Sequence, residues 1–416
     1  MARLLIPAWN MPGRCDIRTM TYVINAYIRR HDTYHSWFEF SDDDCLVRRT
    51  VSNPADINFI ATRHGAMGPS QWREHVLATP SPLQWDCFRF GVIQRDDHFT
   101  FYLSVDHLHA DAMFIMPLFV EIYMNYTALV GGGAPIRLPE AARYLDFCAR
   151  QHQYASCLTL ESPEVSGWVD FLQNNDGAQP KFSLPLGDPS VSCLGDLLTV
   201  ELMNSHQTDC FESACTTVGV RFIGGVFACA AIAEHKLTGS TQYAVVTPTT
   251  TRTTAAEFVT TGWFTGLVPI SVPVGGQPFG DVARAAQASF DSNMYMANVP
   301  IERVIELARS LPGIGAPSRG SAMLSYLDID LPPLSPVIMT QWEKLNGRIY
   351  SDLGAAKQIG IWVTRRGTGT TVTIALPDNP IARKSAARYA AAMKAVFLEV
   401  AQAHGARALF ANAAGS

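Results

Sequence analysis

The sequence lacks an excess of positive charge. Its 32 lysines and arginines stand against 37 aspartates and glutamates, which gives a formal net charge of −5. It also lacks a dense basic stripe with interleaved aromatic residues. Because both features are typical of proteins that neutralise a phosphate backbone, we expect no nucleic acid among its partners.

Long uncharged apolar runs are missing as well. No stretch approaches the roughly 18 uncharged apolar residues that span a bilayer as a helix. Residues 1–7 are too short for the apolar region of a signal peptide. These absences predict a soluble, cytoplasmic protein, and they are compatible with peripheral association at the inner face of a membrane.

The nine cysteines show no pairing pattern. They are odd in number and scattered, without a Cys-x2-Cys pair or a zinc-ligand spacing. Several lie in apolar segments, so we expect buried, reduced thiols. A cysteine nucleophile is not indicated.

The chain does have ample material for a hydrophobic interior, with 416 residues, 48% of them hydrophobic and 17% charged. This length exceeds one ordinary core, so we expect two lobes. Predicted helices and strands alternate along the chain, which indicates an α/β fold. The pattern lapses into Gly, Pro, Asp and Ser near residues 176–192. We therefore predict an N-terminal lobe over residues 1–175, a linker over 176–192, and a C-terminal lobe over 193–416.

The most informative segment sets His107 and Asp111 four residues apart where an apolar strand, residues 99–105, is predicted to run into a buried helix. Asp111 would fall in the first turn of that helix, where a carboxylate is favoured. His107 would lie in the turn, free to face a cleft and act as a base, since an unperturbed histidine has a pKa of about 6.5. Backbone N–H groups near Asp111 and Ala112 could stabilise an oxyanion. The alternative is an ordinary turn histidine followed by a helix cap.

A metal site is a second alternative. The spacing His107-x-His109-x-Asp111 imitates the His-x-His-x-Asp-His zinc motif of metallo-β-lactamases. That motif needs another histidine where this chain has Ala112. We therefore predict no metal at these residues and keep a zinc hydrolase as an alternative.

Two separated stretches point to one family. Residues 106–112, Asp-His-Leu-His-Ala-Asp-Ala, are similar to the His-His-x3-Asp-Gly signature of the chloramphenicol-acetyltransferase-like superfamily, which includes the condensation domains of peptide synthetases. Residues 247–252, which end in Arg252, and residues 262–269, Gly-Trp-Phe-Thr-Gly-Leu-Val-Pro, resemble the later pattern of that superfamily. Residues 325–328, Ser-Tyr-Leu-Asp, resemble a Tyr-Leu-Gly-type stretch of condensation domains. The sequence of the first lobe resembles most closely the polyketide-associated (Pap-type) acyltransferases of actinobacteria. The resemblance covers essentially the whole chain.

The resemblance implies two chloramphenicol-acetyltransferase-like lobes, each a mixed sheet with flanking helices, and an active site at the cleft between them. It implies that His107 is the general base, and that Asp111 pairs with Arg252 and gives structural support. Candidate substrate-binding residues are Ala112, Trp263, Phe264 and Ser325. For His109 we expect no catalytic role.

The implied reaction moves a fatty or polyketide acyl chain from a thioester to a hydroxyl of a trehalose-type glycolipid or a lipid alcohol, without a covalent intermediate. The donor is an acyl-CoA or a polyketide synthase carrier protein, no cofactor is needed, and a monomer is expected. An amide-forming condensation enzyme and an inactive condensation-like interaction domain remain as alternatives.

The chain departs from the family pattern at three positions. The first histidine of the signature is Asp106, the glycine is Ala112, and an asparagine frequent in the later pattern is Gly266. The chain also starts close to its first long helix, so we expect the upstream strand of the family to be missing and the protein to be a shortened form.

Overall fold

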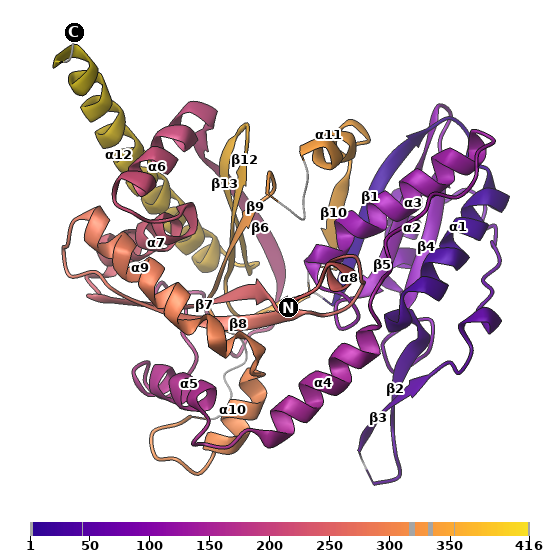
Figure 1. Cartoon of the computed structure of the whole chain (residues 1–416), viewed down its shortest axis with the longest axis horizontal. Helices are drawn as coiled ribbons and strands as arrows, with labels where there is room; N and C mark the ends of the chain where they lie inside the picture. The colour runs from indigo at the N-terminus through magenta and orange to yellow at the C-terminus, as the bar shows by residue number, and fades with distance from the viewer. Residues whose placement is uncertain (1–2, 44, 316–320, 332–335, 353, 415–416) are drawn as a thin grey trace.

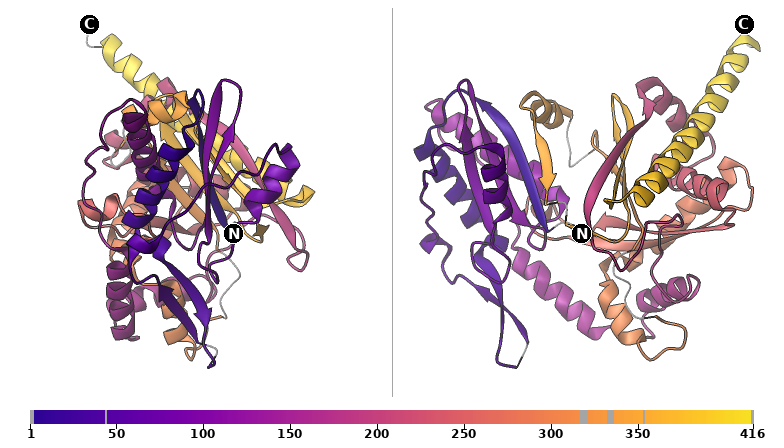
Figure 2. Two further views of the ribbon diagram at one scale, coloured as in Figure 1. Left: turned by 90° about the vertical axis from the view of Figure 1, so that its right-hand side faces the viewer. Right: turned by 180° about the vertical axis from the view of Figure 1, so that it is seen from behind.

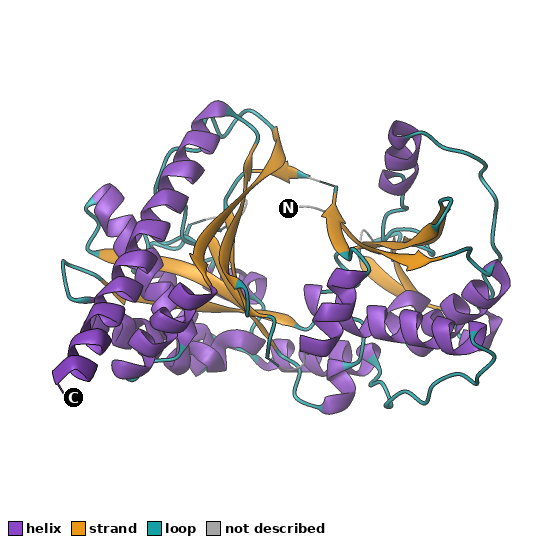
Figure 3. Ribbon diagram, turned by 90° about the horizontal axis from the view of Figure 1, so that it is seen from above, coloured by secondary structure: helices purple, strands orange, loops and turns teal. Residues whose placement is uncertain are grey.

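The computed structural model describes residues 3–43, 45–315, 321–331, 336–352 and 354–414, which form two lobes, each built on one large β-sheet (Figure 1). Viewed from above, both sheets lie toward the middle of the molecule, with most helices on their outer and lower sides (Figure 3). A two-stranded hairpin, β2 (Ser36–Phe40) with β3 (Leu46–Thr50), extends from the first lobe. The prediction of an α/β fold with two sheet-based lobes is confirmed.

The first sheet has the strand order β10-β1-β5-β4, and every pair in it is antiparallel. Its strands are β1 (Leu4–Pro12), β4 (Phe88–Gln94), β5 (His98–Asp106) and β10 (Arg348–Ser351). We expected a mixed sheet here, but β4 and β5 form a hairpin and β1 runs opposite to both of its neighbours. The expectation of a missing upstream strand is also wrong, because β1 lies inside the sheet.

Helices cover both faces of this sheet. Side chains of β1 alternate between two apolar clusters, with Trp9 packing toward α1 (Ile17–Arg30) and α3 (Ile115–Val130). On the other face, Ile6 packs toward α2 (Pro69–Leu77). β1 is therefore apolar on both sides, which removes the alternation of polarity that normally identifies a strand.

The second sheet is mixed and has the order β11-β6-β13-β12-β9-β7-β8, with β9 parallel to both β12 and β7. Its strands are β6 (Cys193–Asn204), β7 (Gln242–Thr250), β8 (Thr265–Pro273), β9 (Met323–Asp328), β11 (Ala355–Ala356), β12 (Gly360–Arg366) and β13 (Gly369–Pro377). The outer face of this sheet is covered by a helical layer, seen from behind in Figure 2. That layer consists of α6 (Ser205–Thr217), α7 (Phe222–Thr238), α9 (Phe279–Asn293) and α12 (Pro380–Ala414).

Two smaller helices, α5 (Pro163–Gln173) and α10 (Ile301–Ala308), share an apolar cluster beside β7 and β8. The helix α4 (Tyr144–Cys157) reaches from the first lobe to this cluster (Figure 1). Its N-terminus is capped by Asp32, which accepts from the backbone N–H groups of the first two helical residues, and Arg303 of α10 donates to Ala155 at its other end. α4 is thus held by both lobes.

The chain also returns to the first lobe late in the sequence. The helix α11 (Pro336–Lys344) packs on α3 through Trp342, and β10 then pairs with β1. A few residues later β11 pairs with β6 of the second sheet. The division at residues 176–192 remains a prediction, to which the structure adds that residues 336–351 belong to the first lobe.

One helix among the described residues, 112–130, is apolar and long enough to cross a membrane, and α6 with α7 meets the same criterion only as a pair bent by 98°. The first of these helices contributes Phe114, Leu118 and Ile122 to the core of the first lobe. Its apolar character is therefore explained by packing against the first sheet.

Candidate active site

His107 directly follows β5 in the first lobe. Its backbone N–H donates to the carbonyl of Arg3 at 2.6 Å, and its Nδ1 lies 2.8 Å from the carbonyl oxygen of Ala110. Because a carbonyl oxygen can only accept, Nδ1 donates in this contact, and in the neutral form of the ring Nε2 then carries the lone pair. Nε2 has no hydrogen-bond partner in the part of the chain that the structure describes. The imidazole is half-buried.

The second lobe covers one side of this imidazole. The ring of Trp263, in the loop before β8, lies 4.8 Å from the ring of His107 at an angle of 55°. Trp263 is held by its own indole N–H, which donates to the carbonyl of Thr265. The neighbouring Gly262 accepts the backbone N–H of Asp111 at 3.0 Å. The predicted motif and the Gly-Trp-Phe segment therefore meet in space.

Asp111 and Arg252 form a buried, two-pronged ion pair. Arg252 Nη1 lies 2.7 Å from Asp111 Oδ2, Nη2 lies 3.0 Å from Oδ1, and both side chains are almost completely buried. Asp111 also accepts from the backbone N–H groups of Met113 and Phe264. Arg252 donates further to the carbonyls of Glu257 and Thr260. Four of the five N–H donors of Arg252 and both carboxylate oxygens of Asp111 are thus engaged by protein groups.

The other predicted substrate-binding residues lie in different surroundings. Phe264 is fully buried, with the Arg252 guanidinium 4.4 Å from its ring centre, and it packs on Phe147. Ala112 is exposed beside the motif. Ser325 lies on β9, on the opposite side of the strand from Leu324, which packs under the outer helices. Ser325 therefore belongs to the face of the second sheet directed toward the first lobe.

The N–H group of Asp111 is already used by Gly262, so the expectation that it could stabilise an oxyanion is wrong. The strand-to-helix turn and the loop around Gly262 are separate in sequence, and no local pattern indicates this bond. Of the two N–H groups considered, only that of exposed Ala112 remains a candidate.

His109 points into the first lobe. It is 2% exposed, with Nε2 3.0 Å from Cys87 Sγ and Nδ1 3.4 Å from the hydroxyl of Thr33. Burial lowers its pKa from 6.5 to about 4 and raises the pKa of Cys87 to about 12. Since His109 and Asp111 are both committed to other partners, they do not converge with His107 on one point. The described residues contain no cluster suited to a metal ion.

A buried polar cluster that the sequence did not reveal fixes the loop after Arg252. His31 Nδ1 accepts the backbone N–H of Thr261, and its Nε2 lies 3.3 Å from Glu121. The hydroxyls of Thr261 and Tyr27 lie 2.7 Å apart. These residues come from α1, α3 and the second lobe, so only the fold brings them together.

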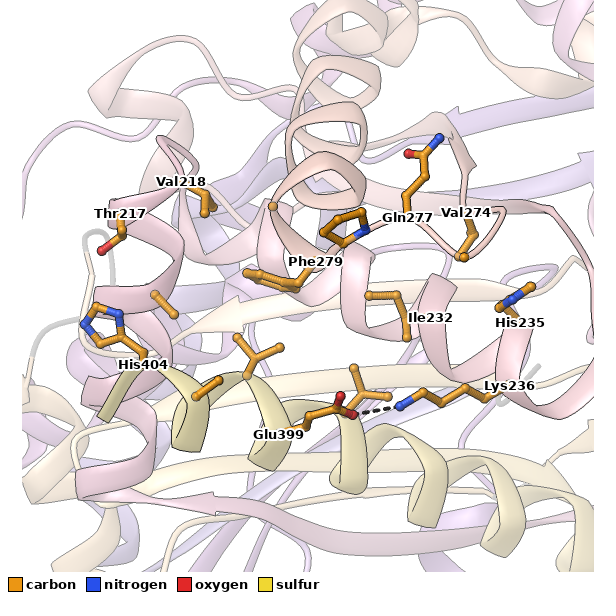
Figure 4. Close-up of a pocket in the computed structure, with 17 residues that line it drawn as sticks. Thr217, Val218, Ile232, His235, Lys236, Val274, Gln277, Phe279, Glu399 and His404 are labelled. Atoms are coloured by element: carbon orange, nitrogen blue, oxygen red, sulfur yellow. Dashed lines mark hydrogen bonds and ion pairs between the residues drawn. The ribbon is translucent and has the colours of Figure 1, made fainter. Parts of the chain in front are cut away.

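The structure also has a pocket of about 450 Å³ on the outer side of the second lobe (Figure 4). It is lined by α6, α7, α9, α12 and residues 274–278, and the ion pair of Lys236 with Glu399 lies among the lining residues. No residue of the predicted site lines it. It lies behind the second sheet from the face that carries Ser325.

Comparison with known proteins gives consistent matches over nearly the whole chain. The family model of the condensation domain matches residues 8–311. The chain is 53% identical to trehalose-2-sulfate acyltransferase PapA2 of Mycobacterium tuberculosis over 401 residues, 96% of this chain and 85% of that protein. It is 49% identical to acyltransferase PapA3 of the same organism, covering 96% of this chain and 84% of the relative.

Solved structures agree. The structure of PapA2 acyl transferase superposes with a TM-score of 0.93 at 53% identity, over 96% of this chain and 87% of that one. The first condensation domain of the calcium-dependent antibiotic synthetase shares the fold, with a TM-score of 0.71 at 16% identity over 96% and 91% of the two chains.

Proposed function

Since the chain belongs to the condensation-domain family of polyketide-associated acyltransferases, the PapA family, we propose that it transfers an acyl chain from a thioester to a hydroxyl of a trehalose-type glycolipid. The observation that carries this proposal is the 2.8 Å contact between His107 Nδ1 and the carbonyl oxygen of Ala110. With Nδ1–H donated to Ala110, the free Nε2 is available to accept the proton of an attacking hydroxyl.

The reaction needs one proton acceptor and no covalent enzyme intermediate. His107 Nε2 takes the proton as the hydroxyl oxygen forms a bond to the thioester carbonyl carbon. The carbon–sulfur bond then breaks, and the protonated imidazole returns the proton to the leaving thiolate. The products are an ester and a free thiol, and atoms and charge balance without a cofactor.

Asp111 and Arg252 support this step indirectly. Their ion pair fixes the turn after His107 against the second lobe, and both side chains are too buried to reach a substrate. The N–H group of Ala112 is our candidate for the oxyanion donor. The Trp263 ring contacts the imidazole and limits its movement. The Phe264 ring packs against the Arg252 guanidinium. Ser325 contributes to the face of the second sheet that is directed toward the first lobe.

The names of the relatives indicate the substrates. One acts on trehalose 2-sulfate, and another, PapA1, is named as a (hydroxy)phthioceranyltransferase that uses 2′-acyl-2-O-sulfo-trehalose. We infer a sulfated or acylated trehalose, or a related lipid alcohol, as the acceptor, and an acyl-CoA or a polyketide synthase carrier protein as the donor. We further propose that the enzyme is a cytoplasmic monomer, peripheral at the inner membrane face.

A rate assay on purified protein tests this proposal. Short-, medium- and long-chain acyl-CoA are each combined with trehalose, trehalose 2-sulfate or a long-chain alcohol, with thiol release and product mass as readouts. We expect ester formation from at least one pair, and a loss of about 100-fold or more for His107→Ala with unchanged thermal stability. An amine acceptor tests amide formation by the same base. Wild-type rates in the His107→Ala variant would contradict the assignment of the base, and inactivity with every pair would favour a domain that only binds partners.

A further inference from the structure

The turn that carries His107 is held on its other side by a second aspartate–arginine pair. Asp106, the last residue of β5, stands where the family signature has its first histidine, and it is 4% exposed. Its Oδ2 lies 3.1 Å from Arg3 Nη1, and its Oδ1 accepts the backbone N–H of Leu108 at 3.0 Å. The carboxylate therefore needs Arg3 as its cation and, at the same time, closes the turn around His107.

Arg3 contacts both residues at the start of the motif. Its guanidinium holds Asp106, and its carbonyl accepts the backbone N–H of His107 at 2.6 Å. The same guanidinium donates to the carbonyls of Thr79 and Pro80, at 2.7 and 3.0 Å. With four such bonds, Arg3 has little freedom to move relative to the imidazole.

Arg3 is itself fixed by the end of β10. Asp352 Oδ1 accepts the backbone N–H groups of Arg3 and Leu4, at 2.7 and 3.1 Å. Asp352 lies in the short segment that leads from β10 of the first sheet to β11 of the second. The contacts thus run from that segment through Arg3 to the residue that carries the base.

We propose that Arg3 and Asp106 are positioning residues, which hold His107 in the orientation that directs Nε2 at the acceptor hydroxyl. This inference rests on the proposed function, because it assumes that His107 is the base. The physical reason is that proton transfer and attack need the reacting atoms within a few tenths of an ångström of their working geometry, and a displacement of about 1 Å costs roughly 100-fold in rate. The Asp106 side chain is buried and both residues bond to the turn that carries His107, so we propose that their effect passes through His107.

The first test separates orientation from stability. Arg3→Gln should lower kcat at least about ten-fold with little change in the KM for acyl-CoA, and Arg3→Lys, which keeps the charge, should retain more of the rate. The control is Arg14→Gln, at an exposed arginine. The double variant Arg3→Gln/Asp106→Asn removes both charges, so no buried carboxylate is left unpaired. We expect it to regain thermal stability while kcat stays low, whereas recovery of kcat together with stability would overturn the proposal.

The second test asks whether the effect passes through the base. In a His107→Ala background, Arg3→Gln should cause no further loss of the residual rate, because there is no imidazole left to orient. A loss of the same factor in both backgrounds would assign Arg3 another role. Asp106→Asn alone provides the same comparison if Arg3→Gln fails to fold. Failure of the proposed function is distinct, since the wild-type protein would then form no ester with any pair of substrates, or His107→Ala would keep the wild-type rate.

Discussion

The carboxylate of Asp111, in the first lobe, and the guanidinium of Arg252, in the second, are joined by two hydrogen bonds of 2.7 and 3.0 Å in a site closed to water. Both groups have additional protein partners, so neither charge is left uncompensated. Such a pair contributes little as a whole relative to an apolar pair, but breaking it from one side is costly.

Asp111→Asn should therefore lower the free energy of unfolding by about 3–5 kcal/mol, because Arg252 would remain buried without its counter-charge. Urea denaturation measures this change. The matched control is Asp281→Asn, which breaks an exposed ion pair with Arg284 and should cost no more than about 1 kcal/mol. Equal effects at the two positions would mean that Arg252 finds water or another partner in the variant.

Gly266 marks a close approach of two backbones. A Cβ atom at this position would lie 1.8 Å from the carbonyl oxygen of Ala297, which cannot move as a flexible side chain could. Gly266→Ala should cost about 2–3 kcal/mol of stability, and the asparagine frequent in the family pattern should cost at least as much. Gly68→Ala is the control, since its Cβ would meet only the end of Gln71 at 3.7 Å. Thermal unfolding measures both variants. Equal melting temperatures for Gly266→Ala and Gly68→Ala would contradict this prediction.

The buried imidazole of His109 makes stability depend on pH. Its pKa falls from 6.5 to about 4 because burial disfavours the charged form. Below pH 6.5, His109 binds a proton in the unfolded chain but stays neutral in the folded protein. The stability that is present above pH 6.5 is therefore lost as the pH falls toward 4. The full contribution is on the order of 3 kcal/mol. The difference in unfolding free energy between wild type and His109→Asn, measured across this range, should shrink with falling pH, and a constant difference would argue against it.

Glu234 on α7 should give the opposite slope. Burial raises the pKa of its carboxyl group from 4.5 to about 7. The folded protein therefore keeps a proton that the unfolded chain has released, so this contribution is fully present below pH 4.5 and is lost as the pH rises through 7. Denaturation of Glu234→Gln should show a steeper rise of stability with pH than the wild type does. A slope identical to that of the wild type would mean that water reaches the carboxylate.

The sequence predicted the strand, turn and helix around His107, because β5 alternates in polarity and the following helix is long and apolar. The Asp111–Arg252 pairing came from the family resemblance alone, since nothing local in either segment indicates it. β1 was not predicted as a strand, because it is buried on both faces and so lacks alternating polarity, and because it contains Pro7 and Pro12. Four-residue β10 is too short for a periodic signal. The Arg3–Asp106 pair depends on both of these strands, so it could be found only in the folded structure.

The late return of the chain to the first sheet has a consequence for synthesis on the ribosome. β1 is made first, yet its partner β10 and the Trp342 side chain that packs 5.8 Å from Trp9 leave the ribosome only after most of the second lobe. Until then the edge of β1 that pairs with β10, and the side of the Trp9 ring that packs on Trp342, would stay open to other chains. Nascent chains halted before residue 336 should therefore depend on a chaperone, and the bonds from Asp352 to Arg3 and Leu4 form only once synthesis has passed Asp352.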